Sequence, residues 1–341
     1  NQGWSAKISL EDGIASTYQW FLDGVLIPGA TSLTYTASES GSYSYEALLS
    51  CGETVQSPII DVVLNKEWDG SVNSNWNNGS NWSPSGVPTS SDFVVVGPSA
   101  NNPVIMGTNY NAYACAVRVK SGATLTINSG NTITVTNTVT VEPTALFELK
   151  NTSSLIQINN VVNSGDIVYK ITANVRNLDY VYWSSPVSGF NINNIVAPLN
   201  PGPIYKWNPI VPNSNGGEGN WEAATANIML PAKGYIVRAP NSFSPSVAAP
   251  LNATFTGTPN NGNINYTIQR GNDTNTSYHQ GINGTEITNF SDNWNLIGNP
   301  YPSPIRASQF LFDNNTKIEG NIRIWTHGTL PAQIASPFYG S

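Results

Sequence analysis

Residues 117–160 read VRVKSGATLTINSGNTITVTNTVTVEPTALFELKNTSSLIQINN, and this stretch decides the fold class. Short runs of Val, Ile, Thr and Leu are separated by SG, NSG and EP turns, and no helical period runs through them. The rungs of a β-solenoid have this pattern, because each strand is short and Asn or Gly takes the corner. A β-sandwich with short hairpins is the alternative. We expect an all-β protein with a β-solenoid-like domain over residues 65–165.

The beginning of this domain is rich in tryptophan. Residues 67–88 read EWDGSVNSNWNNGSNWSPSGVP and contain Trp68, Trp76 and Trp82. The open end of a solenoid needs bulky apolar cover, so we predict that these three side chains cap the first rung. The alternative is an exposed aromatic platform that binds sugar.

Residues 1–64 carry an immunoglobulin-like pattern. Trp20, in YQWFLDGVLIPGA, occupies the place of the core tryptophan of a central strand. The stretch from Glu39 to Tyr43 resembles the turn in which a tyrosine hydroxyl fixes a corner of that fold. Tyr45 stands where antibody domains have their second cysteine, which excludes the usual inter-sheet disulfide. The zone is short for a sandwich, so we expect it to be incomplete at its N-terminus.

Residues 166–341 contain one phrase twice. The first copy is YVYWSSPVSGF (180–190) and the second is DNWNLIGNPYPSPI (292–305), each with a tryptophan before a proline turn. Alternating strands and Asn-Gly turns between the copies predict an antiparallel β-sandwich of jelly-roll type. Residues 304–312 can form one or two helical turns.

The second copy has no counterpart of the strand at residues 234–237 before Ser341. A duplicated β unit without its last strand leaves an open edge. We therefore expect a domain that is incomplete at its C-terminus, with the missing strand supplied either by further residues of the polypeptide or by a neighbouring molecule.

The composition restricts the function. Charged residues make up 10% of the 341 residues, and the formal net charge is −7. A nucleic-acid-binding face needs clustered Lys and Arg, whereas the 14 basic residues here are scattered, so we expect no nucleic-acid partner. No apolar run is long enough to span a bilayer. Cys51 and Cys115 either form a disulfide between the first two domains or remain apart, with Cys115 as a small buried apolar residue.

The motifs together resemble a known class of protein. YQWFLDG with GSYSYEA, the Trp-rich opening that ends in WSPSGVP, and YWSSPVSGF followed by WNLIGNPYPSPI are similar to large Bacteroidetes cell-surface proteins exported by the type IX secretion system. The resemblance covers essentially the whole chain. It implies an extracellular location at the cell surface and the type IX machinery as a partner during export. It also implies a role as an adhesin or fibre component, with self-association, other surface proteins or glycans as partners.

Catalytic motifs are missing from the sequence. His279 and His327 are the only histidines, and no HExxH, G-x-S-x-G or phosphate-loop motif occurs. We therefore predict a protein that is not an enzyme and that has no cofactor and no catalytic residue. The alternative is a carbohydrate-binding accessory region of a secreted enzyme that acts on polysaccharides.

A few residues remain as candidate sites. Glu218 and Glu222 flank Trp221 in SNGGEGNWEAA, which is either a sugar-facing loop or a solvated loop around a buried tryptophan. Asp273, with Asn272 and Asn275, has the oxygen ligands of a weak Ca²⁺ site, but a plain turn is favoured and no metal site is predicted.

Large aromatic residues in strands are predicted to be structural anchors. Trp20, Trp183 and Trp294 lie in strand-like settings followed by apolar alternation, so we expect all three in the core, with Tyr43 holding its corner.

Overall fold

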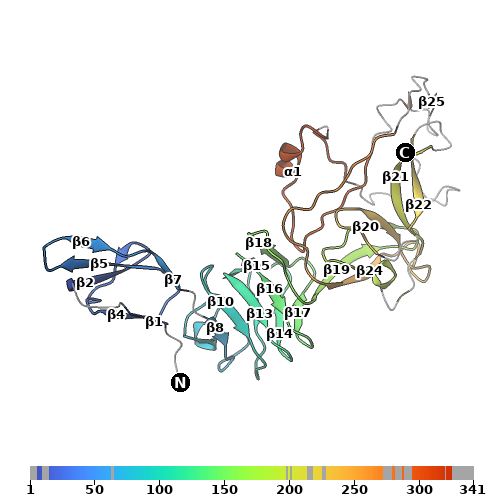
Figure 1. The fold of residues 1–341 in the computed structure, drawn as a ribbon. Coiled ribbons are helices and arrows are strands. Elements are labelled where there is room, and N and C mark those ends of the chain that lie inside the picture. Colours follow the sequence, from blue (N-terminus) through green and yellow to red (C-terminus); the bar gives the residue numbers. More distant parts are fainter. Residues whose placement is uncertain are drawn as a thin grey trace. The chain divides into compact units, whose positions relative to one another are not determined.

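A computed structural model describes residues 6–9, 15–62, 65–196, 199, 202–212, 218–224, 228–271, 279–280, 286–287, 294–318 and 320–324. The described chain is nearly all β, as predicted, and has a β-solenoid of about four turns (Figure 1). The backbone divides into two compact units. One contains residues 1–147 and 155–165, and the other contains residues 148–154 and 166–341.

The N-terminal part of the first unit contains two small antiparallel sheets. β1 pairs with β4, and the other strands lie in the order β3-β2-β5-β6, with β7 also paired to β5. The strands are β1 (Ala6–Ser9), β2 (Ala15–Leu22), β3 (Val25–Leu26), β4 (Thr34–Ala37), β5 (Gly41–Leu49), β6 (Thr54–Gln56) and β7 (Ile60–Val62).

Aromatic packing occupies the place of the missing disulfide in this part. Trp20 is completely buried, its ring centroid lies 5.3 Å from that of Tyr45, and its indole N–H donates to the Ser32 carbonyl at 2.9 Å. Tyr43 is buried too, and its hydroxyl donates to the Glu39 carbonyl at 3.0 Å. Trp20 and Tyr43 therefore have the core and corner positions expected from the sequence.

The solenoid consists of three parallel ladders. The first contains β8 (Asn65–Trp68), β10 (Phe93–Val96), β13 (Ala116–Val119) and β16 (Val139–Val141), with β9 (Trp82–Ser83) antiparallel at its edge. The second contains β11 (Val104–Ile105), β14 (Thr124–Ile127) and β17 (Leu146–Leu149), and the third contains β12 (Asn111–Ala114), β15 (Thr132–Val135) and β18 (Ser154–Gln157). Figure 1 shows β10, β13 and β16 side by side.

Identical residues stack inside this solenoid. Val94 pairs in register with Val117, and Val117 pairs with Val139, so that one turn takes 22 or 23 residues. All three side chains are buried. Strands β14, β15 and β16 bury alternate apolar residues, and stacking of such residues from turn to turn explains the short Val, Ile and Leu runs of the sequence.

Three tryptophans close the first turn, as predicted. Trp68, Trp76 and Trp82 are all buried, and the rings of Trp68 and Trp76 each meet Trp82 edge to face, at centroid distances of 5.0 and 4.7 Å. A short 3-10 helix, η1 (Gly79–Asn81), lies between Trp76 and Trp82. Burial of all three rings excludes an exposed sugar platform at this position.

The second unit contains antiparallel strands. β19 (Ile167–Val175) pairs with β24 (Ala249–Gly257) along its full length. A four-stranded sheet has the order β20-β23-β21-β22, formed by β20 (Tyr180–Trp183), β21 (Ile204–Pro212), β22 (Glu218–Ala223) and β23 (Tyr235–Arg238). The remaining elements are η2 (Ile192–Asn194), β25 (His279–Gln280), β26 (Glu286–Ile287) and α1 (Ala307–Asp313).

Helices are a minor part of the described chain. α1 has seven residues and overlaps the segment 304–312 where one or two helical turns were expected, ending one residue beyond it. No helix among the described residues has the length and apolar character needed to cross a bilayer.

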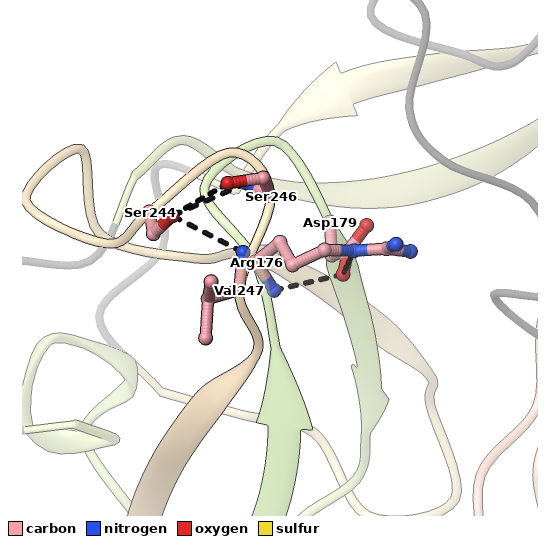
Figure 2. Close-up of polar contacts among 5 residues, drawn as sticks. All are labelled: Arg176, Asp179, Ser244, Ser246 and Val247. Atoms are coloured by element: carbon pink, nitrogen blue, oxygen red, sulfur yellow. Dashed lines mark hydrogen bonds and ion pairs between the residues drawn. The ribbon is translucent and has the colours of Figure 1, made fainter.

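A polar turn leads from β19 into β20 (Figure 2). The buried carboxylate of Asp179 accepts hydrogen bonds from the backbone N–H of Arg176 at 2.8 Å and from its Nε at 3.2 Å. The Asn177 N–H donates to the Ser244 carbonyl at 2.9 Å, while the Ser244 hydroxyl accepts from the backbone N–H groups of Ser246 and Val247. This network fixes the start of β20, which carries the first copy of the repeated phrase.

Cys51 and Cys115 are both free thiols, so the structure lacks the disulfide considered between them. Cys51 is exposed in the turn between β5 and β6, whereas Cys115 is half-buried at a corner of the solenoid. The Cys115 sulfur accepts a hydrogen bond from the Asn137 side chain at 3.2 Å. The two cysteines therefore lie in separate places, Cys51 in the connection between β5 and β6 and Cys115 at a corner of the solenoid.

Candidate functional site

The two copies of the repeated phrase lie against each other within the second unit. Ile297 forms an antiparallel bridge with Lys233, the residue two positions before β23. The Gly234 N–H donates to the Leu296 carbonyl at 3.2 Å, and the Gly298 N–H donates to the Ala232 carbonyl at 2.9 Å. The second copy therefore pairs with the segment that enters β23, and β23 in turn pairs with the first copy in β20.

One amide side chain joins the two proline turns. The Asn260 Nδ2 donates to the Ser185 carbonyl at 3.2 Å and to the Pro300 carbonyl at 2.9 Å. Its backbone N–H donates to the Pro186 carbonyl at 3.0 Å. Asn260 thereby holds equivalent turns of the two copies at a fixed separation.

Gly298 lets the copies approach closely. A Cβ atom at this position would lie 2.2 Å from the Cβ of Ser184, which is far inside van der Waals contact. Gly234 is equally crowded, because a Cβ there would lie 2.6 Å from the Leu296 Cγ. The glycine in IGNP is thus required where the backbone of the second copy passes over the first.

A cavity of about 570 Å³ lies between the copies. Tyr182, Trp183 and Ser184 of the first copy line one side, and residues of the second copy from Leu296 to Pro304 line another. Tyr169 of β19 completes the aromatic part of the wall. All residues that line the cavity belong to the second unit.

The aromatic walls are held by hydrogen bonds. The Tyr169 hydroxyl donates to the Ser153 carbonyl at 3.3 Å, and the Tyr301 hydroxyl donates to the Gly262 carbonyl at 2.6 Å. Burial raises the pKa of both phenols, so both remain neutral at physiological pH. The cavity therefore has fixed, uncharged aromatic sides.

A second cluster surrounds Trp221 on β21 and β22. Trp221 lies directly opposite Trp207 in the strand register, with the two rings at 74° and a centroid distance of 5.2 Å. The Trp207 indole N–H donates to the Trp294 carbonyl at 2.8 Å, and the Arg323 guanidinium lies 4.5 Å from the centre of the Trp294 ring. Sugar platforms need exposed, coplanar rings, whereas these rings cross each other or stack on a cation.

Glu222 is held between cations in this cluster. Its carboxylate lies 3.5 Å from the Lys206 Nζ and accepts from the Asn208 amide at 2.8 Å. Burial lowers the pKa of Lys233; the positive charge of Lys206 adds to this effect, and the Glu222 charge opposes it. Glu222 thus pairs with Lys206 and partly offsets the effect of burial on the pKa of Lys233.

Glu218 and Glu222 both lie in a strand rather than in a loop. Both lie in β22, four residues apart, which separates their α-carbons by about 13 Å in a strand. The side chain of Glu218 lies outside the described residues.

The predicted tryptophan anchors have different outcomes. Trp183 is 7% exposed, so the expectation of a core position is confirmed for this residue. Trp294 is 41% exposed, so the expectation of a core position was wrong there. The surroundings of Trp294 explain its exposure. Its carbonyl accepts a hydrogen bond from the Trp207 indole, and its ring lies against the Arg323 guanidinium rather than against an apolar wall.

Asn272, Asp273 and Asn275, for which a plain turn was favoured over a weak Ca²⁺ site, lie outside the described residues. Among the residues that are described, no group of three or more His, Cys, Asp or Glu side chains is placed to hold a metal ion.

A family model with the description "Domain of unknown function (DUF8693)" matches residues 67–341. The chain belongs to this family. No curated protein and no solved structure matches the chain. The DUF8693 match begins within β8, so it includes the tryptophan cap, the solenoid and both copies of the phrase.

Sequence reasoning missed the cavity of the DUF8693 region. It identified the two phrases as repeats but did not place them against each other, and it left Asn260 and Tyr169 without a role. The available signal was the glycine that both segments have at the crossing, in AKGY (232–235) and in IGNP (297–300). Paired glycines mark places where two backbones approach each other.

Proposed function

We propose that the chain is a non-catalytic part of a secreted cell-surface protein and serves there as an adhesin or as a structural component. The observation that carries this proposal is the four-turn solenoid with its tryptophan cap, which follows an immunoglobulin-like zone along the chain. In such repeats each turn contacts only its neighbours, so the fold makes a self-supporting, extended surface.

The surface chemistry supports the same role. Ion pairs between turns lie on the outside of the solenoid: Arg118 pairs with Glu142 of the next turn, and Lys120 pairs with Glu67 two turns away. Hydrogen bonds to the Ser121 N–H and to Arg118 lower the pKa of Glu142, which keeps this carboxylate charged and bound. These charged side chains link turns of the solenoid to one another.

The resemblance of the motifs to type IX secretion substrates adds the route and the place, namely export by that machinery and exposure at the cell surface. Self-association or other surface proteins are the partners that fit this role.

The test uses intact cells of the producing organism. Antibodies against the chain should label unbroken cells, brief external protease treatment should remove the label, and deletion of the gene should reduce attachment to surfaces. A strain without a working type IX machinery should retain the protein inside. Protein that stays protected from protease in wild-type cells would contradict the proposal.

A separate assay tests the absence of catalysis. The purified protein should release no product from a panel of polysaccharides and peptides. Turnover that disappears in Glu218→Gln or Glu222→Gln would contradict the proposal.

A further inference from the structure

The cavity between the two phrases has the size of a ligand site. Its volume is about 570 Å³, and binding pockets for small molecules measure about 300 to 1,000 Å³. Most of its walls come from two segments that are more than a hundred residues apart in sequence, and the Asn260 amide and the Gly298 crossing hold these segments together. Such a preformed cavity requires little ordering when a ligand binds.

The wall carries no formal charge. Tyr, Trp, Ser, Thr, Asn and aliphatic residues line it, and no Asp, Glu, Lys, Arg or His is among these lining residues. A charged ligand would lose water there without gaining a counter-ion, which is costly. The cavity therefore selects a neutral ligand.

Both aromatic rings and polar groups line the cavity. The Tyr182 side chain is accessible, since the residue is 36% exposed, while hydrogen bonds of their hydroxyl groups hold Tyr169 and Tyr301 in place. A sugar ring has an apolar face of C–H groups and a rim of hydroxyl groups. Its face fits an aromatic side chain, and its rim needs nearby amides and hydroxyls.

Two polar groups of the cavity wall retain hydrogen-bonding capacity for a ligand. The Ser184 hydroxyl is buried and has no hydrogen-bond partner among the described residues. Asn299 uses one N–H on the Ser303 carbonyl at 2.6 Å, and its Oδ1 accepts from the Tyr301 N–H at 3.0 Å. An amide nitrogen has two N–H groups, so Asn299 retains one for a ligand.

We infer that the cavity between the two phrases binds a neutral carbohydrate, with Tyr182 as the stacking surface and Asn299 and Ser184 as hydrogen-bonding groups. The inference rests on the proposed function and deepens it, because it gives the surface protein a class of ligand. It assigns no role in sugar binding to the crossed rings of Trp207 and Trp221.

The test measures binding of the whole purified chain to an array that holds neutral hexose oligomers beside sulfated and uronic-acid oligomers. We expect binding to neutral oligomers and none to the acidic ones. Tyr182→Ala should weaken binding about tenfold or more, and Tyr182→Phe should retain most of it. Tyr113→Ala is the matched control, because Tyr113 is an accessible strand tyrosine of the solenoid, 44% exposed, and should leave affinity unchanged.

Ser184→Ala separates a binding role from a structural one. Removal of a buried hydroxyl without a partner should leave the unfolding midpoint of the free protein equal or higher. The same change should weaken sugar binding severalfold. An unchanged affinity in both Ser184→Ala and Tyr182→Ala would overturn the inference, as would binding of acidic oligomers alone or of none of the oligomers.

Failure of this inference can be told apart from failure of the proposed function. Cells that are labelled from outside but whose protein binds no neutral sugar would overturn the ligand and leave the surface role intact. Protein that stays protected inside the cell would overturn the surface role whatever the array shows.

Discussion

Trp183 and Trp294 hold the same place in two copies of one phrase, but the first is 7% exposed and the second 41%. Trp183 lies in β20, directly opposite Tyr235 of β23. Trp294 lies before the paired part of its copy, with its carbonyl bound by Trp207 and its ring beneath Arg323. Similar local sequence therefore did not produce similar burial.

The difference shows what a repeated phrase specifies. Turn geometry depends on neighbours in sequence, because proline and glycine restrict the backbone locally. Burial depends on which distant segment covers the side chain, and the two copies receive different covers. The copies are also not equivalent in pairing, since the second lies beside the entry to β23 and the first lies in the sheet itself.

The largest difference in unfolding free energy is expected between alanine variants of the two tryptophans. Trp183→Ala should lower the free energy of unfolding by about 3 to 5 kcal/mol, because it empties a packed site. Trp294→Ala should cost about 1 kcal/mol or less, mainly the loss of the contact with Arg323. Urea unfolding of the two variants and the wild type measures both values. Equal losses would show that the copies are equivalent after all.

A smaller effect is expected at the crossing of the copies. Gly298→Ala should destabilise the protein by about 1 to 3 kcal/mol, because the new Cβ would lie 2.2 Å from the Ser184 Cβ. Gly320→Ala is the matched control, since nothing lies within 4 Å of its would-be Cβ. Adding Ser184→Gly should recover most of the loss. Equal stability of the Gly298→Ala and Gly320→Ala variants would show that a glycine is not needed at position 298 for the contact between the copies.

The next effect concerns the amide that joins the two proline turns. Asn260→Ala removes two hydrogen bonds and should cost about 1 to 2 kcal/mol. Asn260→Asp should cost more, because it places a carboxylate against the Ser185 and Pro300 carbonyls. Thermal unfolding of both variants tests this order. A more stable Asp variant would show that the amide does not bridge the turns.

The features that sequence predicted are those with nearby or repeating partners. The solenoid followed from its short apolar runs, since every turn meets the next at 22 or 23 residues. The tryptophan cap followed from three rings within fifteen residues. The corner of Tyr43 needs only Glu39, four positions earlier.

The features that sequence did not predict need distant partners. Trp294 contacts Arg323 through its ring and Trp207 through its carbonyl. The Asn260 side chain reaches back to residue 185 and forward to residue 300. The cavity is lined by residues of both copies and by Tyr169 of β19. No local pattern encodes which of two similar phrases will be covered, so neither the exposure of Trp294 nor the cavity could be derived from the sequence.

The hydrogen bond between Tyr43 and Glu39 joins residues four positions apart, and we expect its loss to have the smallest effect on stability and an effect that depends on pH. Tyr43→Phe removes the hydrogen bond to Glu39 and should cost about 0.5 to 1.5 kcal/mol at pH 7. Burial raises the pKa of the Tyr43 phenol, and the nearby Tyr35 raises it further. The folded state then holds this proton more tightly than the unfolded state, in which the pKa is about 10. The stabilisation is complete below about pH 10 and is lost as the pH rises through the folded pKa.

Urea unfolding at pH 7 and at a series of pH values above 10 measures this loss. The gap in unfolding free energy between wild type and Tyr43→Phe should narrow as the pH rises, because the variant has no such proton to lose. A gap that stays constant or widens with rising pH would show that Tyr43 does not contribute in this way.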